Sequence, residues 1–337
     1  MDSTLPLGKL PPDLLASLLA KAPINDPRVI IGPGIGMDCA VIDLGSQVLV
    51  IKSDPITFAT DDIGWYAVQI NANDVATTGA TPRWMLATLL LPEKQTTPAL
   101  AEQIFDQLAR AAGEQNISLV GGHTEVTYGL NRPILVGTLI GEVQREQLVI
   151  PSAVQPGDRL LLTKGVPVEG TALLAREFPH RLRPILSEAE IAEAAGYLYQ
   201  PGISVVRDAR IATHAGHVTA MHDPTEGGLA SALWELAEAS GRSLWFDPQA
   251  VPVPPLSRRV CDAFGIDPLA TIASGALLMA VAGQDAAAIA SALRAEGIPC
   301  AEIGRVQDGA PGVWVAEGTP LPRPLRDEIA KIYELNG

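Results

Sequence analysis

The sequence has 337 residues, of which 47% are hydrophobic and 18% charged, which is enough for about two domains with a large core. Lys and Arg number 24 and Asp and Glu 38, so the formal net charge is −14. A surface of this charge repels nucleic acid and anionic membranes, and we expect neither as a partner. A local phosphate site is still compatible with it, because helix N-termini, backbone N–H groups and bound metal supply positive potential.

Cysteine use and hydropathy predict a cytoplasmic protein. The cysteines are Cys39, Cys261 and Cys300, with no C-x-x-C pair, which is typical of a reduced protein without disulfides or a thiolate zinc site. No apolar run approaches about 18 residues, so we expect no membrane span. The first residues lack a basic segment followed by an apolar one, so we expect no signal peptide.

Residues 1–150 are predicted to alternate strands and helices. Hydrophobic spacing and Gly or Pro stops place helices at 11–22, 61–80 and 98–115, and strands at 29–31, 39–43, 48–53, 84–91, 118–121 and 133–143. Few aromatic residues (4%) together with 31 Gly and 28 Pro favour an α/β protein with tight turns over a helical bundle.

Glycines alternate along the segment G-P-G-I-G-M-D-C at 32–39. Gly34 and Gly36 allow unusual φ angles and close approach of the backbone to a ligand, although many glycine-rich turns bind nothing. The segment runs into a strand and not into a helix, so it is not a Rossmann fingerprint. We interpret it as a candidate cofactor-binding turn.

Three aspartates recur around the next elements. Asp38 begins one strand, Asp54 ends its expected hairpin partner, and Asp74 lies on the following helix. If the hairpin pairs as expected, Asp38 and Asp54 lie at the same end of it. A lone aspartate is most often a cap or turn residue, but converging carboxylates suit Mg²⁺, which completes its shell with water and phosphate oxygens. The three together predict a metal–phosphate site.

The helix predicted at 61–80 carries polar residues within an apolar sequence. Asn71, Asn73 and Asp74 interrupt it, and buried polar groups cost free energy unless something pairs with them. Two alternatives follow: the three side chains face solvent, or they face a ligand.

A second glycine turn is expected at G-G-H-T-E-V, residues 121–126, directly after a strand. Gly121 and Gly122 offer backbone N–H groups, and His123 and Thr124 offer polar side chains. Ligands of α/β sheets usually bind at the carboxyl ends of strands, so the turn is a candidate nucleotide site. It is equally open that His123 and Thr124 only satisfy backbone groups of the turn.

Residues 151–337 are predicted to form a second domain, after a polar, Pro-rich passage at 150–157. Expected strands are 159–163, 218–222, one ending at 246, 274–281, 300–306 and 313–315; expected helices begin near 169 and cover 187–199, 204–215, 229–240, 284–295 and 324–335. The segment D-P-T-E-G-G-L, 223–229, again follows a strand and opens a helix. The N-terminus of that helix is a candidate anion site.

The ordered motifs resemble the AIR synthase-related superfamily. They read D-C-A-V, K-S-D-P, N-A-N-D-V-A-T-T-G-A-T-P, G-G-H-T-E-V, D-P-T-E-G-G-L and S-G-A-L-L, and they cover nearly the whole chain. The superfamily includes aminoimidazole ribonucleotide synthetase, selenophosphate synthetase, thiamine-monophosphate kinase and the hydrogenase maturation factor HypE. The last two motifs are most similar to HypE.

The resemblance implies two α/β domains, a homodimer whose N-terminal sheets join into a barrel, and ATP bound with Mg²⁺. By matching motifs, it implies metal ligands at Asp38, Asp54 and Asp74, and catalytic roles for Asp74, His123 and Asp223. It also implies nucleotide or phosphate contacts at Asn71, Asn73, Gly121, Gly122, Thr124, Thr225, Gly227 and Gly228. The glycine-rich segment adds Gly34 and Gly36 as candidate cofactor-binding residues.

The implied reaction is transfer of the ATP γ-phosphoryl group to an oxygen of a small substrate, such as an amide or carbamoyl group. Positioning and charge neutralisation dominate such catalysis, in agreement with a site of carboxylates and backbone donors. The sequence leaves two alternatives open: a small-molecule kinase resembling thiamine-monophosphate kinase, and a nucleotide-binding maturation partner without catalysis. HypE proteins end in a Pro-Arg-x-Cys tail, whereas this sequence ends K-I-Y-E-L-N-G, so we expect chemistry that differs from that of HypE.

Overall fold

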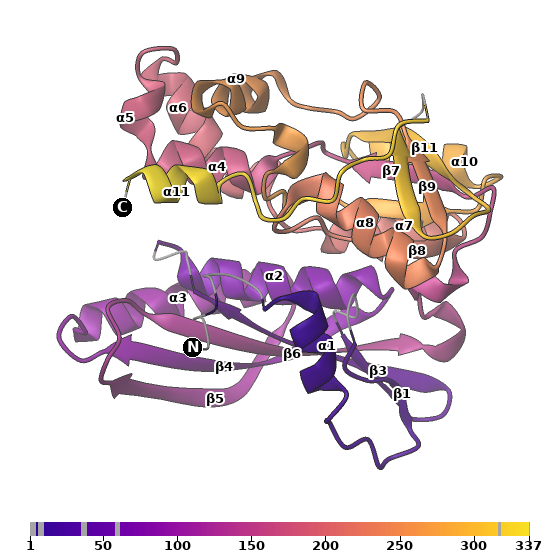
Figure 1. The fold of residues 1–337 in the computed structure, drawn as a ribbon. Helices are drawn as coiled ribbons and strands as arrows, with labels where there is room; N and C mark the ends of the chain where they lie inside the picture. The colour runs from indigo at the N-terminus through magenta and orange to yellow at the C-terminus, as the bar shows by residue number, and fades with distance from the viewer. Residues whose placement is uncertain (1–4, 6–9, 35–38, 58–60, 316–317, 337) are drawn as a thin grey trace.

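The protein contains two α/β units in the computed structural model, which describes residues 5, 10–34, 39–57, 61–315 and 318–336 (Figure 1). The first sheet has the strand order β1-β2-β3-β6-β4-β5, and the second β12-β9-β11-β7-β10-β8. The predicted architecture of two α/β domains is thus confirmed. The prediction of a dimeric barrel and the predicted division at residue 150 stay predictions.

The first sheet and its helices come from the N-terminal half. The strands are β1 (Val29–Ile31), β2 (Ala40–Asp43), β3 (Gln47–Ile56), β4 (Thr81–Pro92), β5 (Ser118–Thr127) and β6 (Ile134–Gln144), and the helices are α1 (Pro12–Leu19), α2 (Ile63–Thr77) and α3 (Pro98–Glu114). The β2–β3 hairpin pairs as predicted, with Ala40 opposite Ile51. Of the pairings within this sheet, β4 with β5 is parallel and the others are antiparallel.

The second sheet follows after two short 3₁₀ turns, Arg145–Gln147 and Pro151–Ala153. Its strands are β7 (Arg159–Thr163), β8 (Val218–His222), β9 (Ser243–Phe246), β10 (Leu278–Val281), β11 (Cys300–Gln307) and β12 (Gly312–Val315). The helices are α4 (Val168–Glu177), α5 (Pro179–Leu182), α6 (Glu188–Ala195), α7 (Val206–Ala215), α8 (Gly228–Ser240), α9 (Pro255–Phe264), α10 (Ala286–Ala295) and α11 (Ala330–Asn336), with 3₁₀ turns at Gly196–Leu198 and Pro268–Ala270.

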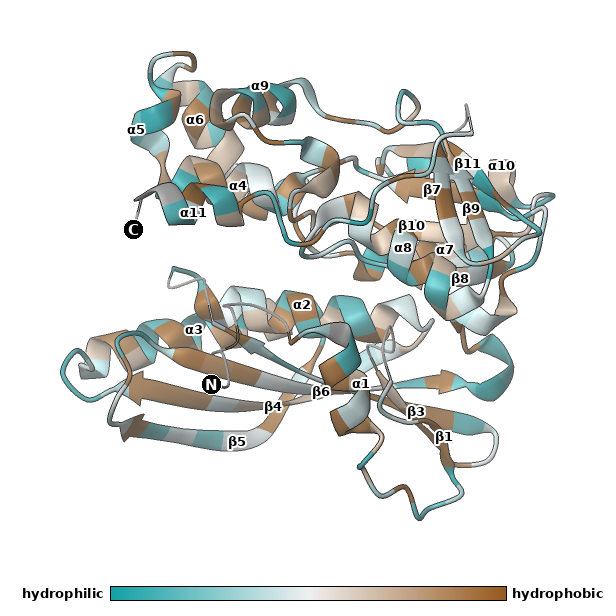
Figure 2. Ribbon diagram, viewed as in Figure 1, coloured by the Kyte–Doolittle hydropathy of each residue, from teal (hydrophilic) through white to brown (hydrophobic). Residues whose placement is uncertain are grey.

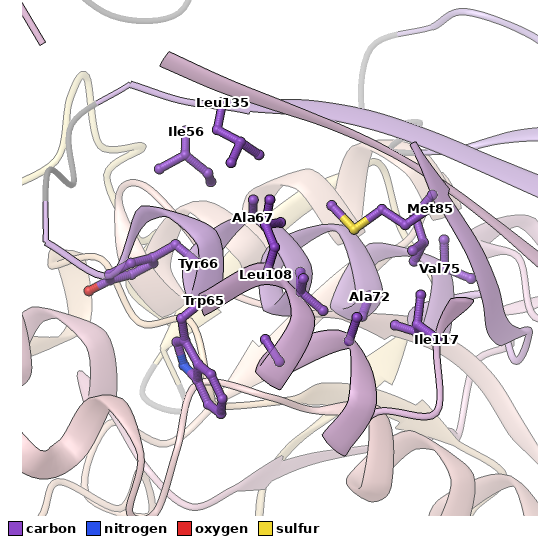
Figure 3. Packing of buried hydrophobic residues seen from close by; sticks show 14 of the residues in the cluster. Ile56, Trp65, Tyr66, Ala67, Ala72, Val75, Met85, Leu108, Ile117 and Leu135 are labelled. Carbon is purple, nitrogen blue, oxygen red and sulfur yellow. The ribbon is translucent and has the colours of Figure 1, made fainter. Parts of the chain in front are cut away.

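Helix α2 is the centre of the molecule. It lies between the first sheet and the C-terminal half (Figure 1), and Ile70 is its only residue that is not buried. A helix that contacts protein on all sides needs no apolar stripe, which explains why polar residues occur along it. Its apolar side chains pack against β4, β6 and α3, as Met85, Leu135 and Leu108 show in Figure 3. Side chains of α2 therefore contact both the first sheet and the C-terminal half.

Three sequence predictions of local structure were wrong. The G-G-H-T-E-V segment is not a turn, because β5 continues through it to Thr127 at the edge of the sheet. Helix α11 begins at Ala330 and not near residue 324, and β10 begins at Leu278 and not at Ser274.

Among the described residues, no helix is long and apolar enough to cross a membrane.

Candidate functional site

Two of the three predicted metal ligands meet at one lysine. Lys52 and Asp54 lie two residues apart on β3, and Asp74 faces them from α2. The Lys52 ammonium nitrogen lies 2.9 Å from Asp74 Oδ2 and 3.4 Å from Asp54 Oδ2. The Asp74 side chain is 6% exposed and that of Asp54 is 39% exposed. The cluster therefore has a buried end at α2 and an open end at Asp54, where a polar ligand can approach.

The two asparagines of α2 are buried, so the alternative that they face solvent was wrong, whereas their contact with a ligand stays a prediction. The Asn71 amide accepts a hydrogen bond from the Asp54 N–H (3.0 Å) and donates to the Ala67 carbonyl (2.8 Å). Asn73 donates to the Ile203 carbonyl and accepts from the Val205 N–H, both at 2.8 Å. Asn71 thus fixes the strand at Asp54 to α2, and Asn73 fixes α2 to the C-terminal half.

A second polar cluster lies where α2 meets the C-terminal half. Glu169 occupies the first turn of α4 and is 6% exposed, and Tyr66 of α2 is 4% exposed. Burial raises the pKa of Glu169 to about 7; the Ser274 hydroxyl opposes the rise, and the nearby carboxylates add to it. Burial, followed by the charge of Glu169, raises the pKa of the Tyr66 phenol. The charge of Glu169 thus acts on Tyr66 across the boundary between the halves.

The loop at 223–228 supplies the remaining carboxylates beside Glu169. Asp223 follows β8 and is 1% exposed. Gly227 and Gly228 both have left-handed φ angles (78° and 60°), and a Cβ on Gly228 would lie 2.5 Å from the Thr271 carbonyl oxygen. Only glycine can therefore bring this turn against its neighbour. The Gly228 N–H donates to the Thr225 carbonyl, which closes the turn before α8.

The predicted anion site at the start of α8 holds an anion from the chain itself. Asp327, which lies 100 residues after Gly227, accepts the Gly227 N–H at 2.6 Å and the Ile329 N–H at 2.8 Å. Burial raises the pKa of Asp327 to about 6, although these backbone hydrogen bonds oppose the rise. The Gly227 N–H, which we expected to bind a phosphate, thus binds Asp327 of the C-terminal segment.

The remaining candidates lie on β5 or in the glycine-rich segment. His123 is 64% exposed in its side chain and pairs with Glu125 at 3.2 Å. Thr124 is exposed beside it, and Gly121 and Gly122 lie in the same edge strand. Gly34 is half-buried, and Gly36 and Asp38 lie outside the described residues. The assignment of these residues to a nucleotide stays a prediction.

Sequence reasoning missed Lys52, Tyr66, Glu169 and Asp327. Lys52 could have been predicted, because the K-S-D-P motif places it two residues from Asp54 on a strand, and residues at that spacing share a face. Glu169 and Tyr66 are 103 residues apart in the chain, and Asp327 is 100 residues from Gly227, so no local spacing connects them.

The donor set at Lys52 fits Mg²⁺ with phosphate. The described residues contain no group of three or more His, Cys, Asp or Glu side chains arranged to hold a metal ion. Mg²⁺ commonly takes one or two protein carboxylates and completes its octahedron with water and substrate phosphates. Asp54 and Asp74 could supply those two, and both carboxylates pair with the Lys52 ammonium in this structure.

Comparison with known families identifies the chain. Residues 36–143 match the N-terminal domain of AIR synthase related proteins, and residues 155–315 match the C-terminal domain. The chain belongs to the AIR synthase related family. Carbamoyl dehydratase HypE of Azotobacter vinelandii is 32% identical over 279 residues, which cover 80% of this chain and 78% of that protein. The predictions of the family and of an enzyme of its superfamily are confirmed.

Solved structures show the same architecture. The hydrogenase maturation protein HypE in complex with ATP is 25% identical, with a TM-score of 0.66, over 89% of this chain and 90% of that one. The HypE–HypF complex contains a chain that is 22% identical, with a TM-score of 0.68, over 84% of this chain and 93% of that one. The second likeness concerns the fold.

Proposed function

We propose that this protein is an ATP- and Mg²⁺-dependent enzyme that transfers the γ-phosphoryl group of ATP to an oxygen of a small substrate, with an amide or carbamoyl group as the acceptor. The observation that carries the proposal is the convergence of Asp54 and Asp74 on Lys52 between a strand and the buried helix α2. The likeness to a HypE bound to ATP supports the nucleotide.

The residues of the cluster have distinct tasks in this proposal. Asp54 and Asp74 would hold Mg²⁺, with Asp38 as the further ligand predicted from the sequence. Bound there, the ion neutralises charge on the phosphates. The Lys52 ammonium donates hydrogen bonds to phosphate oxygens from its place beside Asp54. Asn71 keeps the Asp54 backbone at a fixed distance from α2, so the carboxylates are positioned before the nucleotide arrives.

The test is Asp74→Asn, with Asp308→Asn as a matched control because Asp308 is 87% exposed in its side chain. We expect Asp74→Asn to lower Mg²⁺-dependent ATP turnover at least about 100-fold, since one electrostatic contact to the transferring group is commonly worth that much. The control keeps full turnover. Calorimetric titration with Mg²⁺ and a non-hydrolysable ATP analogue measures binding separately. Wild-type protein that neither binds nor hydrolyses ATP at any Mg²⁺ concentration would sink the proposal.

We also propose a homodimer and a maturation-protein partner. The support for the dimer is an apolar surface on the first sheet, where Trp84, Leu86 and Val120 are 37%, 38% and 55% exposed. The support for a partner is the complex of HypE with HypF, whose HypE-like fold this chain shares. We further propose a cytoplasmic location, which rests on the cysteine pattern of the sequence; the side chains of Cys39, Cys261 and Cys300 are all buried.

A further inference from the structure

Glu169 is a buried carboxyl group with an unused oxygen. Its side chain lies in the first turn of α4, and the groups that act on it electrostatically include Ser274 and Asp223 of the C-terminal half, while its own charge acts on Tyr66 of α2. Glu169 Oε2 and the Tyr66 hydroxyl have no hydrogen-bond partner in the part of the chain that the structure describes. These four residues are each 6% exposed or less (Tyr66 4%, Glu169 6%, Asp223 1%, Ser274 0%). They form one enclosed polar cluster at the junction of the two halves.

Packing alone does not explain such a group. A buried polar atom without a partner costs free energy, and each one calls for an explanation, such as a catalytic role or a bound water, ion or ligand. The same helix shows the usual arrangement one half-turn later: Thr171 donates to the Pro167 carbonyl at 2.6 Å and lies 2.7 Å from the Ser257 hydroxyl. The helix thus satisfies its other buried polar side chain with protein partners but leaves Glu169 Oε2 for something else.

The surroundings of Glu169 favour proton transfer. The charged groups that face it from the C-terminal half are Glu226, Asp327 and Asp223, in that order of effect. Tyr66 faces it from α2, and the nearby Arg176 is engaged with Asp62 at 2.5 Å. With burial and three carboxylates acting together, the pKa of Glu169 is about 7, so the proton is gained and lost near neutral pH.

One helix connects this cluster to the proposed phosphate site. Tyr66 and Asp74 both lie on α2, eight residues apart, which corresponds to about 12 Å along the helix axis. A substrate that accepts a phosphoryl group from a nucleotide at Asp74 can therefore extend along the helix toward Tyr66. The acceptor atoms of Glu169 and Tyr66 suit a substrate that presents an N–H or O–H group, such as an amide, a carbamoyl group or an alcohol.

We propose that Glu169 is the catalytic base for this substrate, with the Tyr66 and Ser274 hydroxyls orienting the reacting group beside it. The inference rests on the proposed phosphoryl transfer and completes its proton balance. The substrate oxygen forms a bond to the γ-phosphorus, and the bond from that phosphorus to the bridging oxygen breaks, leaving its electron pair on ADP. The N–H or O–H proton of the substrate passes to Glu169 Oε2, which releases it to solvent after the products leave.

The decisive variant is Glu169→Gln, which keeps shape and hydrogen bonding but cannot take the proton. We expect kcat to fall about 100- to 10,000-fold, the usual worth of general acid–base catalysis, with the affinity for Mg²⁺ and the ATP analogue unchanged. The acid limb of the kcat–pH profile of the wild type, near pH 7, disappears in the variant. Glu177→Gln, on an exposed position of the same helix, is the matched control and keeps the wild-type rate and profile.

Chemical rescue separates a base from a merely structural residue. Glu169→Ala leaves space for a small carboxylate. Added formate is expected to raise the kcat of this variant at least tenfold and to leave the kcat of Glu177→Gln unchanged. If Glu169→Gln does not fold, Glu169→Asp replaces it and is expected to lose at least tenfold in kcat. Full activity of the folded glutamine or aspartate variant, or an unchanged pH profile, would overturn the inference and leave the ATP-dependent function intact. Failure of the wild type to bind ATP overturns the proposed function instead.

Discussion

Asn73 carries more structural weight than its place on a helix suggests. Its amide makes one donated and one accepted hydrogen bond to the backbone of residues 203 and 205, and both partners belong to the other half of the chain. An amide side chain can satisfy a carbonyl and an N–H at the same time, because it has both a donor and an acceptor. Asn73 therefore joins helix α2, which carries Asp74, to the C-terminal half.

Replacement of Asn73 by Ala is expected to destabilise the protein by about 2–4 kcal/mol, because it leaves a buried N–H and a buried carbonyl without partners at about 1–3 kcal/mol each. Urea unfolding at constant pH measures the change. Asn131→Ala, at an exposed loop position, is the control and should change stability by less than about 0.5 kcal/mol. A loss equal to that of the control would contradict the described contacts.

The raised pKa of Glu169 predicts a pH dependence of stability. Folding raises this pKa from 4.5 to about 7, so the folded state binds the proton more tightly than the unfolded chain. The contribution of Glu169 is therefore most favourable below pH 4.5 and declines as the pH rises toward 7. The total decline is about 3 kcal/mol, at 1.36 kcal/mol per pH unit.

Glu169→Gln removes this titration. The free energy of unfolding of the variant, measured relative to that of the wild type, is therefore expected to rise by about 3 kcal/mol between pH 5 and pH 8. Urea unfolding of both proteins at the two pH values tests it; Asp327, which also titrates in this range, is common to both and cancels. Gain of stability with loss of activity is the pattern expected of a functional residue. An identical pH dependence of the two proteins would show that Glu169 is not held in this environment.

At the level of elements, strand β5 depends on close contact at Gly122. A Cβ there would lie 1.9 Å from the Ala87 carbonyl oxygen, and the φ angle of 147° is rare for other residues. Gly122→Ala is expected to cost roughly 3 kcal/mol or more by separating β5 from β4. Thermal unfolding followed by circular dichroism measures it. Gly113→Ala, on α3 with nothing within 4 Å, is the control and should leave the transition unchanged or raise it.

Helices with one apolar face and strands with regular alternation could be predicted well from the sequence. Helix α3 and strands β7 and β8 have the predicted bounds within a residue. Helix α9 could also have been found, since Pro255 opens it, Gly265 closes it and its apolar residues have helical spacing. The extended course of β5 could not, because Gly-Gly signals a turn unless a neighbouring strand requires close approach of the backbone.

The candidate site was predictable only where its residues share a local motif. The sequence identified Asp54 and Asp74, and these do meet at Lys52. The backbone partners of Asn71 and Asn73 could not be predicted, because no sequence pattern marks them. The cluster at Glu169 depends on contact between α2 and α4, and only the folded chain defines it.

For the molecule as a whole, the feature that bears on assembly is an exposed apolar face of the first sheet. Met85 points into the core against α2, whereas Trp84 and Leu86 on either side of it are exposed on the opposite face. Half-buried Val136 and Ile140 of the neighbouring strand lie opposite Thr88 and Trp84. Figure 2 shows hydrophobic residues along much of β4 and β6. An apolar sheet face next to an open edge strand favours association.

We therefore predict that the wild type sediments as a dimer at micromolar concentration and that Leu86→Lys sediments as a monomer, because the lysine charge cannot be buried against a second apolar face. Analytical ultracentrifugation measures both. Phe105→Lys, which places the same charge at a 54%-exposed aromatic residue of α3, is the control and should remain dimeric. A monomeric wild type, or dissociation by the α3 substitution and not by Leu86→Lys, would place the interface elsewhere. Since Leu86 is exposed, circular dichroism of the variant should match that of the wild type, so that loss of the dimer reflects the surface and not unfolding.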